Sequence, residues 1–163
     1  MSLSRFSGEN LRCIERIELE ELARVNLFVG LNGAGKTSVL EGIHLLGTGR
    51  SFRTRRLGGV VRQGEGVLRS VGWVEVAENR TEVLGFERRG NRIEMRRNGE
   101  RVARSSDLAR VFPLLVVRPE SFGIFSGAAE ERRRALDWAV FHVEPSALVI
   151  LAGIRMIGVR WLV

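Results

Sequence analysis

Residues 30–37 constrain the fold of this chain more than any other segment. They read Gly-Leu-Asn-Gly-Ala-Gly-Lys-Thr and match the pattern G-x-x-x-x-G-K-[ST] at every fixed position. An apolar run over residues 25–29 precedes the segment, and leucine and isoleucine at helical spacing follow it. Because a strand, a glycine-rich loop and a helix in this order form the usual phosphate-binding context, the sequence predicts a P-loop that binds a nucleotide.

The residue types of this loop suit a phosphate ligand. Its three glycines permit positive φ angles and leave room for backbone N–H groups to converge on phosphate oxygens, and the following helix adds its unpaired amides and the positive end of its dipole. We expect Lys36 to contact the β- and γ-phosphates and the Thr37 hydroxyl to bind Mg²⁺. The residues predicted to hold the nucleotide are Gly30, Leu31, Asn32, Gly33, Ala34, Gly35, Lys36 and Thr37.

The charge of the chain points to a polyanionic partner. There are 25 Arg and a single Lys, which is Lys36, and the formal net charge is +7. Just after the predicted helix, one aromatic residue, Phe52, stands among four arginines that could bind the phosphate backbone of DNA while the ring stacks on a base. These arginines are Arg50, Arg53, Arg55 and Arg56. Two alternatives stay open: the arginines cover a solvated surface, and Phe52 packs into the core.

The helix after the loop is predicted to bury one stripe of side chains. Its apolar positions at core spacing are Leu40, Ile43 and Leu46. Gly42 interrupts the helix at a cost of about 0.5–1 kcal/mol relative to alanine. His44 lies beside the stripe and is interpreted as a core or boundary residue, since no second His or Cys stands near it.

The remaining pattern predicts strands and two more helices. Residues 11–19 alternate as a half-buried strand, with residues 24–29 as its expected neighbour. Residues 67–102 have period two and predict an antiparallel meander with turns at Glu78-Asn79, Arg89-Gly90-Asn91 and Asn98-Gly99. Further predictions are a helix over residues 105–111 capped by Ser105 or Ser106, a buried strand over 114–117 and a longer helix over 129–141. The fold class predicted is α/β, a P-loop NTPase lobe with a mixed sheet and the meander attached as a subdomain.

Cysteine content and the terminal segments indicate in which cellular compartment the protein acts. Cys13 is the only cysteine, which excludes an internal disulfide and a thiolate metal cluster. Residues 1–11 lack the apolar core of a signal peptide, and the apolar tail after residue 147 is too short and too charged for a membrane span. The sequence therefore predicts a cytoplasmic protein without a membrane partner.

Several segments resemble the amino-terminal lobe of the RecF family, bacterial DNA replication and repair ATPases related to SMC and ABC-type ATPases. The matching segments are residues 30–41, Leu45-Leu46, residues 49–53, Arg118-Pro119-Glu120, Arg132-Arg133, Leu136-Asp137-Trp138 and Phe141-His142-Val143-Glu144-Pro145. The resemblance implies a RecF-like ATP-binding lobe over residues 1–146, followed by a divergent apolar tail over 147–163. Departures are Gly42, where alanine is more usual, and Leu11-Arg12-Cys13, where the family tends to show Phe-Arg-Asn.

The resemblance also implies ligands and partners. These are ATP and Mg²⁺, single-stranded or double-stranded DNA, the mediators RecO and RecR, and an ATP-dependent homodimer, in replication, recombinational repair and the SOS response. The family continues beyond Pro145 with a helical arm, a signature motif and a Walker B strand, to which residues 147–163 show no likeness. We therefore expect a truncated or frame-shifted chain.

Such a chain is expected to bind ATP without hydrolysing it alone. Cleavage needs an acid at the end of an apolar strand, but the two aspartates, Asp107 and Asp137, fall in predicted helices. Residues 125–130 resemble an ABC signature and residues 141–145 the end of a Walker B strand, although a valine stands where the aspartate belongs. Glu120 is the residue expected nearest the γ-phosphate by likeness to related ATPases, and no catalytic residue is assigned.

Two other functions stay open. The P-loop is also compatible with a small kinase acting on a soluble substrate. A GTPase is disfavoured, because its Asn-Lys-x-Asp guanine-binding motif requires a second lysine. Alternatively, the chain is a non-functional fragment whose exposed lobe interface makes it aggregate.

Overall fold

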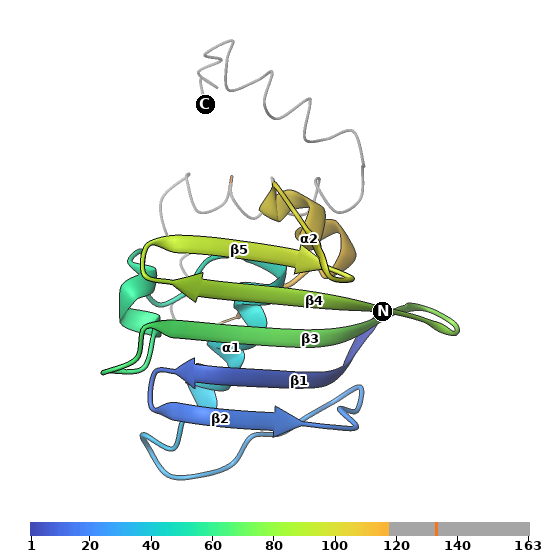
Figure 1. The fold of residues 1–163 in the computed structure, drawn as a ribbon. Coiled ribbons are helices and arrows are strands. Elements are labelled where there is room, and N and C mark those ends of the chain that lie inside the picture. Colours follow the sequence, from blue (N-terminus) through green and yellow to red (C-terminus); the bar gives the residue numbers. More distant parts are fainter. Residues whose placement is uncertain (118–132, 134–163) are drawn as a thin grey trace, which may run out of the picture. The chain divides into compact units, whose positions relative to one another are not determined.

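The computed structural model describes residues 1–117 and residue 133. The strands are β1 (Ser2–Leu11), β2 (Ile14–Leu19), β3 (Val67–Ala77), β4 (Arg80–Arg89), β5 (Arg92–Arg97) and β6 (Glu100–Arg101). The helices are α1 (Lys36–Thr48), the short 3₁₀ helix η1 (Leu57–Val60) and α2 (Ser105–Val111). The strands form one sheet in the order β2-β1-β3-β4-β5-β6, in which neighbouring described strands are antiparallel (Figure 1).

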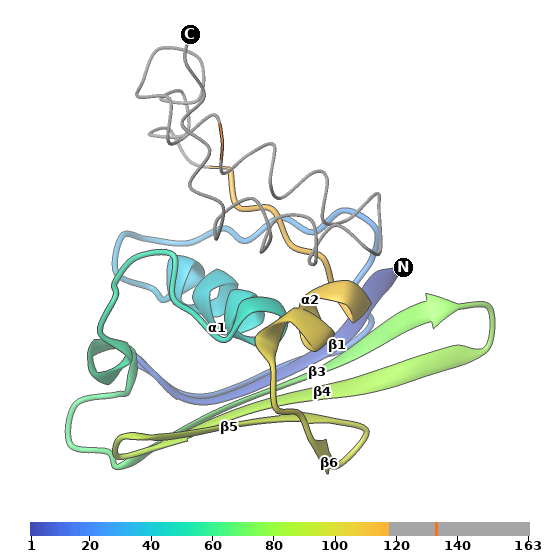
Figure 2. The same ribbon diagram turned by 90° about the horizontal axis from the view of Figure 1, so that it is seen from above.

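The two α-helices of residues 1–117 cover the same face of this sheet (Figure 2). Alternate residues of the strands point to that face and are buried beneath α1 and α2. The buried apolar residues are Phe6, Leu11, Val39, Leu45, Leu46, Val60, Leu68, Val74, Leu84, Phe86, Leu108, Val111 and Phe112. The opposite face carries cross-strand ion pairs such as Arg5–Glu18 and Arg69–Glu87. The sheet is therefore apolar on one face and solvated on the other, as antiparallel sheets often are.

The predicted meander and its turns are confirmed. β3, β4, β5 and β6 follow one another as hairpins, and their turns contain residues with positive φ, namely Asn79 (59°), Gly90 (55°), Asn98 (51°) and Gly99 (85°). β3 also pairs with β1, so the meander continues the sheet that begins before the P-loop. The domain boundary predicted at residue 146 lies outside the described residues.

The strand predicted over residues 24–29 is wrong. These residues form no strand, and the side chains of Val25, Leu27 and Val29 are 85%, 87% and 83% exposed. The strand predicted over residues 11–19 is confirmed only for residues 14–19, which form β2, because Leu11 ends β1 and Arg12-Cys13 form a turn; the neighbour of β2 is this unpredicted strand β1. The two-residue turn at Arg12-Cys13 folds β1 back onto β2, and the other edge of β2 pairs with no described strand.

Two expectations near α2 also need correction. The buried strand predicted over residues 114–117 is wrong. No described strand pairs with these residues, and Leu115 and Val117 are 64% and 78% exposed. The helix over residues 105–111 is confirmed, but its N-cap is Arg104 and no side chain caps it, since Ser105 is already the first helical residue. The predictions made on residues 118–132 and 134–163 lie outside the described residues.

Gly42 lets α1 lie close to the sheet. A Cβ atom added at Gly42 would lie 2.6 Å from Leu11 Cδ1 and 2.9 Å from Phe6 Cζ, both on β1. Of the predicted stripe, Leu46 is buried whereas Leu40 is 47% exposed, because the helix turns its glycine-containing side to β1. The interpretation of Gly42 as a flaw is therefore wrong: the missing side chain is what permits this packing.

We expect Gly42→Ala to lower the free energy of unfolding by about 1–2 kcal/mol. Overpacking a filled core costs about 1–3 kcal/mol, and the better helix propensity of alanine returns at most about 1 kcal/mol. Urea unfolding measures the change. Gly85→Ala is the control, because a Cβ added there would meet its nearest atom, Arg96 Cβ, at an ordinary 3.7 Å. A gain in stability for Gly42→Ala would contradict the packing argument.

Candidate nucleotide site

The P-loop adopts the backbone that its glycines permit. Gly33 and Gly35 have φ angles of 86° and 93°, in the left-handed region. Gly35 is the N-cap of α1, and no side chain caps the helix. The amides of Gly33 and Gly35 donate to no other described residue, whereas the Ala34 amide donates to Leu31 O at 3.2 Å. The start of α1 therefore presents unpaired N–H groups beside the loop, which suits an anion.

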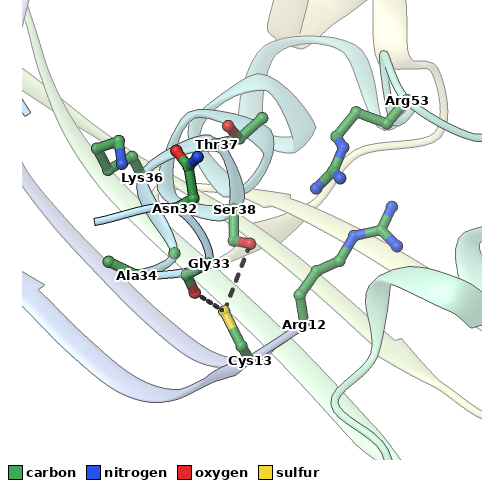
Figure 3. A pocket seen from close by; sticks show the side chains of 10 residues that line it. Arg12, Cys13, Asn32, Gly33, Ala34, Lys36, Thr37, Ser38 and Arg53 are labelled. Carbon is green, nitrogen blue, oxygen red and sulfur yellow. Dashed lines mark hydrogen bonds between the residues drawn. The ribbon is translucent and has the colours of Figure 1, made fainter. Parts of the chain in front are cut away.

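These groups border an open cavity of about 420 Å³, which falls in the usual range of ligand sites. Its lining residues are Arg12, Cys13, Asn32, Gly33, Ala34, Gly35, Lys36, Thr37, Ser38 and Arg53 (Figure 3). Six of the eight predicted loop residues line it, and the other two, Gly30 and Leu31, supply carbonyl groups to Lys36. The lining contains three cationic side chains and no carboxylate, so the cavity fits a polyphosphate.

The Lys36 ammonium group is held by its own loop. Its Nζ donates to Gly30 O at 2.7 Å and to Leu31 O at 2.8 Å. Both acceptors are neutral carbonyl groups, and an anionic phosphate oxygen is a stronger acceptor than either. Lys36 can therefore exchange these bonds for a phosphate without losing hydrogen bonding.

The loop is also tied to the β1–β2 turn. The Cys13 thiol donates to Gly33 O at 3.6 Å, and Cys13 Sγ lies 3.9 Å from Ser38 Oγ (Figure 3). Gly35 also packs closely against Ile14, the first residue of β2, because a Cβ atom added at Gly35 would lie 2.9 Å from Ile14 Cγ1. The β1–β2 turn and the start of β2 thus pack against the phosphate loop.

An ion-pair cluster that was not predicted from the sequence lies beside this cavity. Glu41, which is fully buried on α1, accepts hydrogen bonds from Arg12 Nε at 2.8 Å and Arg12 Nη2 at 2.9 Å. Ser51 Oγ also donates to this carboxylate, and Arg53 Nη1 lies 3.6 Å from it. The apolar stripe predicted for this helix placed Glu41 on the polar side, so the sequence carried no signal for this cluster, which follows from burial because a buried carboxylate requires a partner.

This cluster shifts the pKa values of its members. Burial alone would raise the pKa of Glu41, but hydrogen bonds from Arg12 and Ser51 and the charges of Arg12 and Arg53 outweigh it and lower the pKa below its ordinary value. The hydrogen bond to Glu41 in turn raises the pKa of the Arg12 guanidinium. Glu41 is therefore ionised at neutral pH and neutralises part of the charge of the two arginines.

The segment of predicted DNA contacts divides into two parts. Arg53 lines the cavity, while Arg50, Arg55 and Arg56 are exposed. Phe52 packs edge-on against His44, with ring centroids 5.3 Å apart at 89°, so the ring anchors the segment to α1. The predicted DNA contacts themselves stay predictions.

His44 is a boundary residue, as predicted. Its Nδ1 lies 2.7 Å from Arg50 O and 3.1 Å from Thr48 Oγ1. Burial lowers the pKa of His44 more than the bond to Arg50 raises it. Among the described residues no group of three or more His, Cys, Asp or Glu side chains could hold a metal ion. In this part of the chain a Mg²⁺ ion would thus depend on Thr37, phosphate oxygens and water.

Comparison with known proteins identifies relatives. The sequence model of the AAA domain family matches residues 5–113. The DNA replication and repair protein RecF of Pseudomonas fluorescens (strain SBW25) is 43% identical over 146 residues, which are 89% of this chain and 40% of that protein. The RecF protein of Stutzerimonas stutzeri (strain A1501) is 41% identical over 145 residues, 88% of this chain and 39% of that protein. The chain thus spans about 40% of the length of the curated relatives it matches.

Solved structures agree. A structure of the recombination mediator protein RecF-ATPrS in the RecFOR pathway has a TM-score of 0.82 and 27% identity, covering 93% of this chain and 41% of that one. A structure of an SMC ATPase has a TM-score of 0.67 at 14% identity, which indicates a shared fold. The resemblance to RecF and the predicted fold class are confirmed. No helix among residues 1–117 has the length and apolar character needed to cross a bilayer.

Proposed function

Because this chain belongs to the AAA domain family, we propose that its P-loop cavity binds ATP with Mg²⁺ and that the chain acts in RecF-type DNA replication and repair. The observation that carries the proposal is the cavity itself, in which unpaired loop amides, the start of α1 and three cationic side chains meet. The solved RecF relatives, one with ATPrS and one with ATP, support the choice of nucleotide.

Different residues of the loop would bind different parts of Mg-ATP. The amides of Gly33 and Gly35 would donate to phosphate oxygens, and Lys36 would contribute a compact positive charge. The Thr37 hydroxyl would bind the Mg²⁺ that accompanies the triphosphate. The described residues that line the cavity include no Asp or Glu to hold the metal shell or orient water. We therefore propose nucleotide binding by these residues and assign them no hydrolytic step.

Binding is tested directly by titrating the purified chain with a fluorescent ATP analogue in the presence of Mg²⁺. Saturable binding that unlabelled ATP displaces is expected. Failure of ATP to displace the analogue would overturn the proposal. The kinase alternative gains no support from the relatives, which are RecF proteins. The fragment alternative predicts aggregation through the exposed apolar residues that precede the P-loop, and light scattering of the same sample tests it.

We also propose that DNA binds through the exposed arginines after α1. Each of Arg50→Ala, Arg55→Ala and Arg56→Ala should weaken binding to DNA and make the log-log salt slope shallower by about 0.9 for each duplex phosphate that the variant no longer neutralises. Fluorescence anisotropy with single-stranded and double-stranded oligonucleotides at several salt concentrations measures this slope. Arg92→Ala is the control, because Arg92 is an exposed arginine of β5 on the solvated face, paired with Glu94. Equal slopes for the wild type and all three variants would exclude this surface.

The proposal extends to partners by likeness to RecF. It includes binding to RecO and RecR, an ATP-dependent homodimer and participation in the SOS response in the cytoplasm. The chain spans about 40% of the length of the RecF protein it matches, so each of these properties is proposed for it and not shown. Sedimentation of the chain with and without ATP tests the homodimer first, since that step requires no second protein.

A further inference from the structure

We propose that Glu41 is a positioning residue that holds Arg12 and Arg53 together at the P-loop cavity, so that both guanidinium groups serve the bound triphosphate. This inference rests on the proposed binding of ATP. It concerns residues that come from three separate parts of the chain: the β1–β2 turn, α1 and the segment after α1.

The position of Glu41 on α1 links the cluster to the cavity. Thr37, in the first turn of α1, lines the cavity, and Glu41 follows it four residues later. Residues at this spacing lie on the same face of a helix, one turn apart. Glu41 is fully buried, so its carboxylate cannot turn outward to water. The carboxylate therefore has a fixed position one helical turn after the phosphate loop. Guanidinium groups that bind it stay beside the cavity.

Arg12 is the firmly held partner. It donates two hydrogen bonds, from Nε and Nη2, to the two oxygens of Glu41, and its side chain is 24% exposed. Its backbone has a φ of 53°, which a non-glycine residue adopts rarely. Such a conformation persists where surrounding contacts hold it: the Arg12 N–H donates to Val60 O at 2.8 Å, while the bidentate bond holds the side chain.

Arg53 is held more loosely. Its Nη1 lies 3.6 Å from Glu41 Oε2, and its side chain is 43% exposed. Its backbone is nevertheless fixed, because Ser51 Oγ accepts the N–H groups of Arg53 and Thr54 at 3.0 Å each. Figure 3 shows the Arg12 and Arg53 side chains directed toward one another beside Ser38. Arg53 can thus turn from the carboxylate to a phosphate while its main chain stays in place.

Without a carboxylate between them, the two guanidinium groups would repel each other and move apart into solvent. With it, the three charges sum to +1, and both arginines remain at the cavity. If Glu41 had a purely structural role, its loss should affect the affinity for ATP no more than the loss of any other buried glutamate that pairs with arginine. Glu82 provides that comparison, because it is 2% exposed and binds Arg97 and Arg80 but lies on β4, and none of the three lines the cavity.

The experiment compares Glu41→Gln with Glu82→Gln in the full chain. Gln keeps the size of the side chain and removes its charge. Both variants should lose stability in urea, whereas only Glu41→Gln should lower the affinity for the fluorescent ATP analogue, by about tenfold. Glu82→Gln should bind within about twofold of the wild type. Equal losses of affinity in the two variants would overturn the inference.

A double-mutant cycle then asks whether Glu41 acts through the arginines. In an Arg12→Ala/Arg53→Ala background, Glu41→Gln should change the affinity for the analogue by less than about twofold. A tenfold loss that persists in this background would overturn the inference. If Glu41→Gln does not fold, Arg12→Ala, Arg53→Ala and the double variant test the inference. Losses of binding free energy that are not additive support a shared anchor, and additive losses overturn it.

Failure of the inference and failure of the proposed function give different results. If the wild-type chain does not bind the analogue, the proposed function fails. If the wild type binds, Lys36→Ala does not and Glu41→Gln binds like the wild type, only the role of Glu41 fails.

Discussion

Replacing Glu41 with alanine is expected to lower the free energy of unfolding by about 3 kcal/mol. Breaking a buried ion pair by removing one partner costs about 3–5 kcal/mol. The lower end applies here, because Arg12 and Arg53 are 24% and 43% exposed and can recover some hydration. The loss has two sources: Arg12 and Ser51 lose their acceptor, and two guanidinium groups face each other unneutralised. Urea unfolding monitored by fluorescence measures it.

Glu15→Ala is the matched control for this loss. Glu15 also pairs with an arginine, Arg62, at 3.3 Å, but its side chain is 76% exposed. Exposed pairs contribute little to stability, so the control should unfold close to the wild type. A loss below about 1 kcal/mol for Glu41→Ala would contradict the assignment of Glu41 as the anchor of this cluster.

The pH dependence gives an independent check on the same residue. The folded pKa of Glu41 lies below its unfolded value of about 4.3. Its contribution is therefore complete above that unfolded pKa and is lost as the pH falls through the lower, folded pKa. The difference in unfolding free energy between the wild type and Glu41→Ala should therefore become smaller as the pH falls from the unfolded pKa through the folded pKa of Glu41. A difference that stays constant would show that the Glu41 charge is not responsible.

Replacing Lys36 with alanine is expected to weaken the binding of ATP about 100-fold. A hydrogen bond to a charged group contributes about 1.5–3 kcal/mol, and Lys36 is expected to serve two phosphates. Lys36→Arg should also bind poorly, since a planar guanidinium group does not replace a compact ammonium group at this position. Competition against the fluorescent analogue measures both variants.

Arg16→Ala is the control for Lys36. Arg16 is an exposed cation on β2 that pairs with Glu18 on the solvated face, so its loss changes the net charge by the same amount. Its affinity for ATP should match that of the wild type. If Lys36→Ala binds ATP as the wild type does, the loop does not hold the phosphates.

Local sequence signals predicted those features that local residues determine. The P-loop and the start of α1 follow from glycines whose positive φ angles only glycine adopts readily, at Gly33 and Gly35. The hairpin turns follow from Asn and Gly residues for the same reason. Gly49 ends α1 in the left-handed region, which glycine adopts without strain at a C-cap.

Features that depend on distant partners were not predictable in this way. Residues 24–29 have the composition of a strand but pair with nothing among the described residues, because pairing is decided by neighbouring strands. The contact between Arg12 and Glu41 joins residues 29 positions apart and left no local pattern. Gly42 was misjudged because helix propensity describes an isolated helix and does not include the approach of β1.

Binding of ATP at the P-loop is tested most directly by the effect of ATP on stability. A ligand that binds only the folded state raises the free energy of unfolding by about 2.7 kcal/mol at a concentration of 100 times its dissociation constant. Urea unfolding of the wild type should therefore shift to higher urea as Mg-ATP is added, whereas Lys36→Ala, which is expected to bind about 100-fold more weakly, should gain only about 0.4 kcal/mol at the same ATP concentration. A wild-type midpoint that does not move with ATP would contradict nucleotide binding by this chain.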